Sequence, residues 1–170
     1  MVIVRAAALL HDAQGSASGS AGRAEHQHVS ADFAAQVLAD EGWDMARIAA
    51  VQHCIRAHRY RGTEKPETLE AKIIFDADKL DVLGAIGAAR VIGYATQAGS
   101  PWYVPPSEQF IKIGKEIEGE QHSAYHEHLY KLRKVRDRMF TQSARAIAEE
   151  RLRYLDEFFE RLIDEWNGKR

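Results

Sequence analysis

The stretch "KIIFDADKLDVLGAIGAAR", residues 72–90, predicts a helical fold because its apolar residues recur at the spacing of an α-helix. With its flanks it predicts one long helix over residues 69–97, or two helices that join near Gly84. The apolar positions are Leu69, Ile73, Leu80, Leu83 and Ile86. They would form a face that packs against a core.

The segments on either side also predict helices. Alanine and leucine favour a helix over residues 2–10, and Ser30 and Asp44 are typical N-caps of two further helices. The C-terminal part predicts helices over residues 123–139 and 142–166. Since no segment shows the alternation of a β-strand, the predicted fold class is all-α.

The composition limits the classes of function. A chain of 170 residues with 45% hydrophobic and 28% charged residues is typical of one domain with a full core, spanning residues 1–170. A net charge of -2 gives no general attraction to polymeric nucleic acid. One cysteine, Cys54, excludes an internal disulfide and is typical of a reducing compartment. Because no apolar run could span a bilayer or serve as a signal peptide, we expect a cytoplasmic protein without membrane contact.

A histidine and an aspartate, His11 and Asp12, follow the apolar segment at residues 2–10. Imidazole and carboxylate are ligands that suit Mn, Fe, Zn or, with more oxygens, Mg. At a helix end both side chains can turn toward one ion. The alternative is that the pair is only the polar end of a helix.

Acidic residues interrupt the apolar pattern of residues 72–90. Asp78 lies within an otherwise apolar helix, and carboxylates are rarely buried without a partner. A cation shared with the His-Asp pair would be such a partner, and a local cap or salt bridge is the alternative. We expect Asp76 to be solvated, whereas the pattern leaves Asp81 open.

The motifs "AALLHDA", residues 7–13, and "AKIIFDADKLDVLGAIGAAR", residues 71–90, together resemble the HD-domain superfamily of metal-dependent phosphohydrolases. The stretch "IRAHRYRGTEKPETLEAK" and the C-terminal tail are similar to small single-domain bacterial members, some of which are nucleotide pyrophosphohydrolases. The resemblance implies an HD-domain helical bundle of about six to seven helices. Residues 123–167 would be a C-terminal helical extension, and the first helix of the family would be absent.

The resemblance also implies a metal site of the H…HD…D type. His11 and Asp12 match its HD pair and Asp78 matches its distal aspartate, so these three are the expected metal ligands. Of the divalent ions we expect Mn, with Mg, Fe, Zn or Ni as alternatives. The first histidine of the pattern has no counterpart in the ten residues before His11. Either the start lies upstream, or the site is incomplete, or another residue takes that place.

His26 and His28 are the nearest candidates for the missing place. His28 resembles, in position, a histidine that some relatives use for a second metal or a phosphate, so it is a candidate substrate-binding residue. A loop histidine in solvent is the alternative for both, and it is the one we favour for His26.

A second pair of histidines lies further along the chain. His58 is near a helix end beside Arg56, Arg59 and Arg61, and is a candidate catalytic residue that contacts phosphate or a second metal. His53 lies near the apolar side of the same helix, where we expect a hydrogen-bonded core histidine.

Basic residues would meet the charge of a phosphorylated substrate. Lys79 follows Asp78 directly, and the resemblance suggests that it contacts a phosphate oxygen beside the metal, in both a catalytic and a substrate-binding role. Arg59 and Arg61 belong to a basic loop that would bind further phosphate or a ribose. A solvated loop is the alternative.

The C-terminal tail offers two further features. His122, His126 and His128 have a spacing that could chelate a metal by chance, and we expect a solvated helix face instead. The apolar stripe at residues 152–166, which includes Phe159, could form a homodimer surface.

The function expected from these features is cleavage of a phosphate ester or nucleotide polyphosphate by a metal-activated water, with Asp12, Lys79 and His58 as catalytic residues. The partner would be a small phosphorylated molecule, in particular a nucleotide. The alternative is a catalytically inactive HD module that binds a nucleotide or a partner protein, because the first histidine ligand is missing. A helical interaction protein is a third hypothesis, which rests on the amphipathic tail.

Overall fold

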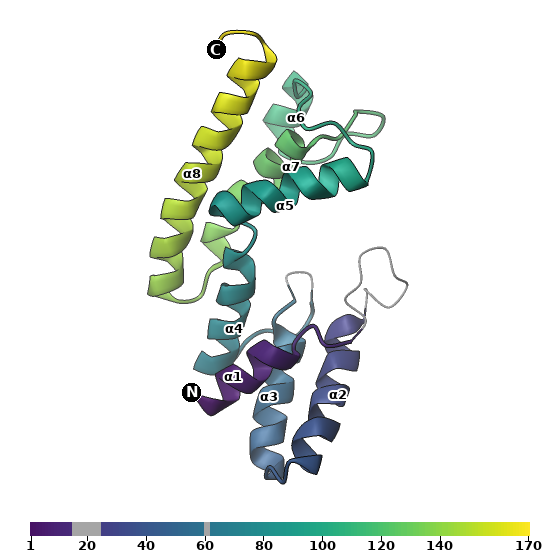
Figure 1. Ribbon diagram of the computed structural model, residues 1–170, viewed down its shortest axis with the longest axis vertical. Coiled ribbons are helices and arrows are strands. Elements are labelled where there is room, and N and C mark those ends of the chain that lie inside the picture. Colours follow the sequence, from purple (N-terminus) through teal and green to yellow (C-terminus); the bar gives the residue numbers. More distant parts are fainter. Residues whose placement is uncertain (15–24, 60–61) are drawn as a thin grey trace. The chain divides into compact units, whose positions relative to one another are not determined.

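The computed structural model describes residues 1–14, 25–59 and 62–170. Within those ranges the chain forms eight α-helices, two short 3₁₀ helices and no β-strand, so the all-α fold class is confirmed (Figure 1). The elements are α1 (Val2–Leu10), α2 (His26–Asp40), α3 (Met45–Ala57), α4 (Leu69–Leu80), α5 (Gly84–Gln97), α6 (Glu108–Ile113), α7 (Ala124–Tyr130), η2 (Leu132–Lys134), η3 (Arg136–Arg138) and α8 (Gln142–Trp166). None of these helices combines the length and the apolar character needed to cross a membrane.

The described residues form two compact units, Met1–Asp78 and Lys79–Arg170. In the first unit α2 and α3 lie side by side in opposite directions, and α1 packs against α3 (Figure 1). Small side chains allow this close packing, since the core of the unit includes the buried residues Ala7, Ala31, Ala34, Val51, Ile55 and Ala71. The assignment of residues 1–170 to a single domain stays a prediction.

The start of α2 corrects one expectation. Ser30 is not the N-cap, because the helix begins at His26 and Ser30 is fully buried inside it. The Ser30 hydroxyl instead donates to the backbone carbonyl of Gln14 (3.1 Å) and accepts from the Gln14 N–H (3.2 Å). Asp44 does cap α3, as predicted. The earlier start places His26 on a helix rather than in a loop.

The segment 69–97 forms two helices, which is one of the two predicted arrangements. They join at Gly84, whose φ of +68° is a left-handed conformation that favours glycine. Gly87 allows a close approach in the first turn of α5, since a Cβ there would lie 2.2 Å from the Val82 carbonyl oxygen. Glycine at these two positions therefore allows the tight turn with which α5 begins.

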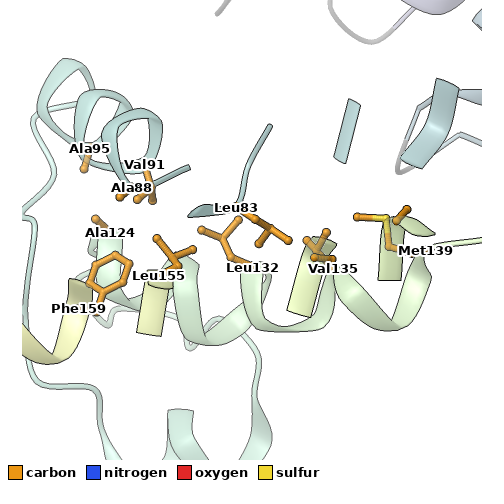
Figure 2. Packing of buried hydrophobic residues seen from close by; sticks show 12 residues of the cluster. Leu83, Ala88, Val91, Ala95, Ala124, Leu132, Val135, Met139, Leu155 and Phe159 are labelled. Atoms are coloured by element: carbon orange, nitrogen blue, oxygen red, sulfur yellow. The ribbon is translucent and has the colours of Figure 1, made fainter. Parts of the chain in front are cut away.

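The second unit has its own apolar core. Figure 2 shows one face of α5 turned toward α7 and α8, with the labelled residues Ala88, Val91, Ala95, Ala124, Leu155 and Phe159. Full burial of a large apolar side chain contributes about 1.5–3 kcal/mol to folding. Because Phe159 is only 1% exposed within the chain, a homodimer surface on the tail could not use it.

The two predicted C-terminal helices differ in outcome. The helix over 142–166 is confirmed as α8, which is capped by the Thr141 hydroxyl. The helix predicted over 123–139 is shorter, because α7 ends at Tyr130 and the chain continues as η2 and η3. Leu132 and Val135 still face the core, since residues three apart share one side of a 3₁₀ helix.

Candidate metal centre

The His-Asp pair lies where α1 ends. His11 is the C-cap residue of α1, and its Nδ1 lies 2.9 Å from the Ala8 carbonyl oxygen. Because a carbonyl oxygen only accepts hydrogen bonds, Nδ1 carries the proton and Nε2 presents a lone pair when the ring is neutral. Nε2 lies 3.8 Å from Asp12 Oδ2 and 4.0 Å from Asp78 Oδ1. The structure therefore brings the three expected metal ligands together.

His58 joins this group from the end of α3. It is the C-cap residue of that helix, and its Nδ1 donates to the Ile55 carbonyl oxygen. Its Nε2 lies 3.7 Å from Asp12 Oδ1, and its side chain is only 4% exposed. In the part of the chain that the structure describes, one group of potential metal ligands has its atoms within 4.8 Å of one another: His11, Asp12 and His58.

His26 contacts the same carboxylate from the first turn of α2. Its Nε2 lies 3.4 Å from Asp12 Oδ1 and 3.4 Å from His58 Nε2. With 13% of its side chain exposed, His26 is not the solvent-exposed loop histidine that we expected. A helix start at His26 has no local sequence signal, because the N-cap residue Glu25 makes no side-chain capping bond at the start of α2.

Asp12 is thus the common neighbour of three imidazole nitrogens, at 3.4 to 3.8 Å. Lone pairs of nitrogen and carboxylate oxygen that converge on one point are what a divalent cation requires. A backbone carbonyl that accepts the second ring N–H is also the usual way in which a metal-ligating histidine is oriented. The donor set therefore fits a divalent cation.

A buried hydroxyl links the turn after the pair to α2. Gln14 follows Asp12 by two residues, and both of its backbone groups are bonded to Ser30 Oγ. Ser30 lies about one helical turn after His26 on α2. One side chain therefore ties the segment that carries Asp12 to the helix that supplies His26.

The aspartates around the end of α4 differ in burial. Asp78, near His11, has 29% of its side chain exposed. Asp76 is 2% exposed, so the expectation of a solvated Asp76 is wrong, whereas Asp81 is exposed. Lys79, directly after Asp78, is buried. Its contact with a substrate phosphate stays a prediction.

The other predicted substrate-binding residues have different surroundings. His28 is half exposed and its Nε2 lies 3.8 Å from Glu25 Oε2. The Arg59 guanidinium donates to Gln27 Oε1 (3.2 Å), which holds it against the start of α2. Arg61 lies outside the described residues.

His53 is a hydrogen-bonded histidine, as predicted. Its Nδ1 donates to Glu64 Oε1 (2.8 Å) and its Nε2 accepts from the Glu67 N–H (3.1 Å). Burial alone would raise the pKa of the Glu64 carboxyl. Hydrogen bonds from Arg56 and His53 outweigh burial and hold that pKa below its usual value. His53 therefore fastens the segment after α3 back onto that helix.

The expectation of a solvated helix face is wrong for His126, which is 1% exposed. Its Nδ1 lies 2.7 Å from Ser123 Oγ, and its Nε2 lies 3.1 Å from Glu120 Oε1. His122, by contrast, has 37% of its side chain exposed.

His128 is also buried rather than solvated. Its Nε2 lies 2.7 Å from Asp156 Oδ1, and its ring stacks on Phe159 at 4.6 Å between centroids. Among the described residues its Nδ1 has no hydrogen-bond partner. Burial lowers the pKa of His128 from 6.5 to about 4, although the Asp156 carboxylate opposes this effect. The ring is therefore neutral at pH 7, and Nε2–H donates to Asp156.

Comparison with known protein families identifies relatives of part of this chain. The model of the HD domain matches residues 1–83. The uncharacterized protein YpgQ of Bacillus subtilis (strain 168) is 33% identical over 99 residues, which are 58% of this chain. The match spans 41% of the length of that relative.

Solved structures extend the similarity to nearly the full chain. An HD-superfamily hydrolase from Bacillus thuringiensis is 30% identical with a TM-score of 0.68, over 97% of this chain and 73% of that one. The crystal structure of Bacillus subtilis YpgQ in complex with ADP is 28% identical with a TM-score of 0.70, over 96% of this chain and 73% of that one.

Proposed function

The chain belongs to the HD-domain superfamily, and from this premise we propose that it is a metal-dependent phosphohydrolase that cleaves a phosphate ester or a nucleotide polyphosphate with water. The observation that carries the proposal is the convergence of His11, His26 and His58 on Asp12. These four residues and Asp78 are the proposed ligands of a divalent cation, for which we expect Mn. In this assignment His26, which follows the HD pair in the sequence, is a further ligand.

A divalent cation held there would polarise a phosphoryl oxygen and lower the pKa of a water ligand. Asp12 and Asp78 would offset the charge of the cation. Asp12, at the centre of the group, is also placed to accept the proton that water loses on attack. His58 would hold Asp12 from its buried side.

Charged residues next in sequence to the ligands would bind the substrate. Lys79 follows Asp78 and Arg59 follows His58 in the sequence, and both are proposed contacts of a substrate phosphate. His28 and Arg61 remain proposed contacts for the rest of the substrate. A nucleotide is the substrate class we propose, and the complex of YpgQ with ADP supports it. The proposed location is the cytoplasm.

The test is metal content and phosphate release measured on the same protein. The chain is stripped with a chelator and reloaded separately with Mn, Mg, Zn and Ni, and each form is given a panel of nucleoside mono-, di- and triphosphates. We expect bound metal by inductively coupled plasma analysis and turnover that depends on it. Asp78→Asn should lower turnover by about 100-fold or more, because it removes a ligand charge.

Asp81→Asn is the matched control, since Asp81 is an exposed carboxylate three residues after Asp78. It should leave metal content and turnover unchanged. Absence of bound metal together with absence of turnover would refute the proposal. If ADP raises the melting temperature but no substrate is turned over, the inactive nucleotide-binding module is the better description.

A further inference from the structure

A pocket in the second unit lies apart in sequence from the HD residues. It has a volume of about 130 Å³ and is lined by Phe110, Glu116, Ile117, Glu120, His122 and His126. That volume is well above the roughly 10–15 Å³ that one water molecule needs in a cavity, so an ion and its water ligands would fit. The lining combines two carboxylates and two imidazoles, which are donor groups of borderline divalent cations.

Two of these donors are already held side by side. Glu120 Oε1 and His126 Nε2 are 3.1 Å apart, a separation at which both can bind one ion. The Ser107 N–H and hydroxyl bond to the two oxygens of Glu120 at 2.8 and 2.7 Å. Ser123 Oγ bonds to the other ring nitrogen of His126. Outer partners of this kind fix the orientation of metal ligands in proteins.

His122 is the third donor. Its ring lies 5.6 Å from that of His126, between centroids, and its Nε2 lies 3.6 Å from Glu127 Oε2. With 37% of the side chain exposed, it has room to turn about its side-chain torsions toward the pair. The three residues form the pattern Glu-x-His-x₃-His, which the phosphohydrolase site does not use.

We propose that Glu120, His122 and His126 bind a divalent transition-metal ion of the zinc class, with water completing the coordination. Two imidazoles and one carboxylate are a ligand set that Zn²⁺ and Co²⁺ accept. The ion takes the place of the proton between His126 Nε2 and Glu120 Oε1, and the ring proton then lies on Nδ1, beside Ser123 Oγ. It joins the segment before α7, which carries Glu120 and His122, to α7, which carries His126, and metal binding therefore stabilises this part of the second unit.

Titration with Co²⁺ tests this site without the first one. The protein carries His11→Ala and Asp12→Ala, which remove the HD pair, and visible absorption reports Co²⁺ with nitrogen and oxygen ligands. We expect about one bound Co²⁺, competition by Zn²⁺, and a higher melting temperature with Zn²⁺. Adding His122→Ala should weaken Co²⁺ binding at least tenfold, and because His122 is partly exposed the helical content should not change.

Glu118→Gln is the matched control, an exposed carboxyl in the same segment that does not line the pocket, and it should bind Co²⁺ as the parent does. If the HD-site variant does not fold, the titration is made on the parent chain, where His122→Ala should remove one class of bound Co²⁺. No Co²⁺ bound outside the HD site, or equal binding with and without His122, would overturn the proposal. Either result leaves the phosphohydrolase proposal unaffected.

Discussion

Histidines meet carboxylates in both units, but their protons are arranged differently. In the first unit backbone carbonyl groups accept Nδ1–H from His11 and His58, so each Nε2 carries a lone pair on the side of Asp12. In the second unit Nε2–H of the buried His128 donates directly to Asp156. Lone pairs in the first arrangement are donors that a divalent cation can bind, whereas in the second a hydrogen bond between His128 and Asp156 already joins the two groups.

The difference shows that the residue types alone do not identify a ligand site. In a neutral histidine, the hydrogen-bond partner of one ring nitrogen decides whether the other ring nitrogen carries a lone pair that can bind a ligand. The pocket that contains Glu120 and His126 is intermediate, since an ion there must displace a shared proton. We therefore expect it to bind metal more weakly than the site around Asp12.

Removal of one carboxylate charge from each unit should give the largest contrast. Asp12→Asn should lower metal-dependent turnover by about 1000-fold, equivalent to about 4 kcal/mol, because it removes the central charge of the proposed site. Asp156→Asn should leave metal binding unchanged and lower the free energy of unfolding by about 2 kcal/mol, through weaker bonds to His128 and Arg133. Metal analysis, phosphate release and urea unfolding measure the two effects. If Asp156→Asn lost turnover and Asp12→Asn did not, the expected contrast between the two units would be wrong.

The second unit should be sensitive to acid because of His128. Its pKa is about 4 in the folded chain and about 6.5 when unfolded, so the unfolded state binds the extra proton first. The free energy of unfolding should therefore fall by about 3 kcal/mol as the pH decreases from about 6.5 to about 4, and be regained at higher pH. Urea unfolding at several pH values, with EDTA present, measures this.

His128→Phe provides the comparison for that experiment, because its ring can stack on Phe159 without taking up a proton. The variant should lose that part of the pH dependence. An identical pH profile for parent and variant would show that burial of His128 does not have the expected effect.

Substitutions of His26 and His28 test which of the two histidines binds metal at the proposed site around Asp12. His26→Ala should weaken metal binding by about 10- to 100-fold, because the His26 side chain contacts Asp12. His28→Ala should have a smaller effect on metal binding, since this half-exposed side chain is paired with Glu25. Metal titration of both variants measures the difference. A larger loss in His28→Ala would exchange their assigned roles.

Ser30→Ala should have the smallest of these effects. It leaves the two backbone groups of Gln14 without their hydroxyl partner and should cost about 1–2 kcal/mol of unfolding free energy. Gln36→Ala, which removes an exposed bond to Asp40 on the same helix, should cost less than about 0.5 kcal/mol. Thermal unfolding of the two variants makes the comparison. Equal losses of unfolding free energy would mean that Ser30 does not stabilise the turn that contains Gln14.

Local sequence signals predicted the helices and part of the first site. Asp44 and the glycine at 84 mark real helix ends, and His11 and Asp12 lie at the end of α1 as expected. These features depend on neighbours within a few residues. The acidic residue within an apolar helix and the family resemblance both indicated Asp78, which lies near His11 in the structure.

The features that were mispredicted depend on partners distant in sequence. Ser30 bonds to Gln14, sixteen residues earlier, so its apparent capping role was misleading. His128 is buried through Asp156, twenty-eight residues later, a contact that no local pattern indicates. Asp76 lies on the buried side of α4, although a charged residue on a helix usually indicates a solvent-facing side.

The ends of the helices around Asp12 also produce an electric field. α1 and α3 finish at His11 and His58, so the partial negative charge of two helix C-termini lies at the place proposed for a cation. α2 begins there with His26, and the partial positive charge of its N-terminus favours an anion such as phosphate. The backbone alone therefore provides attraction of both signs, before any side-chain charge is counted.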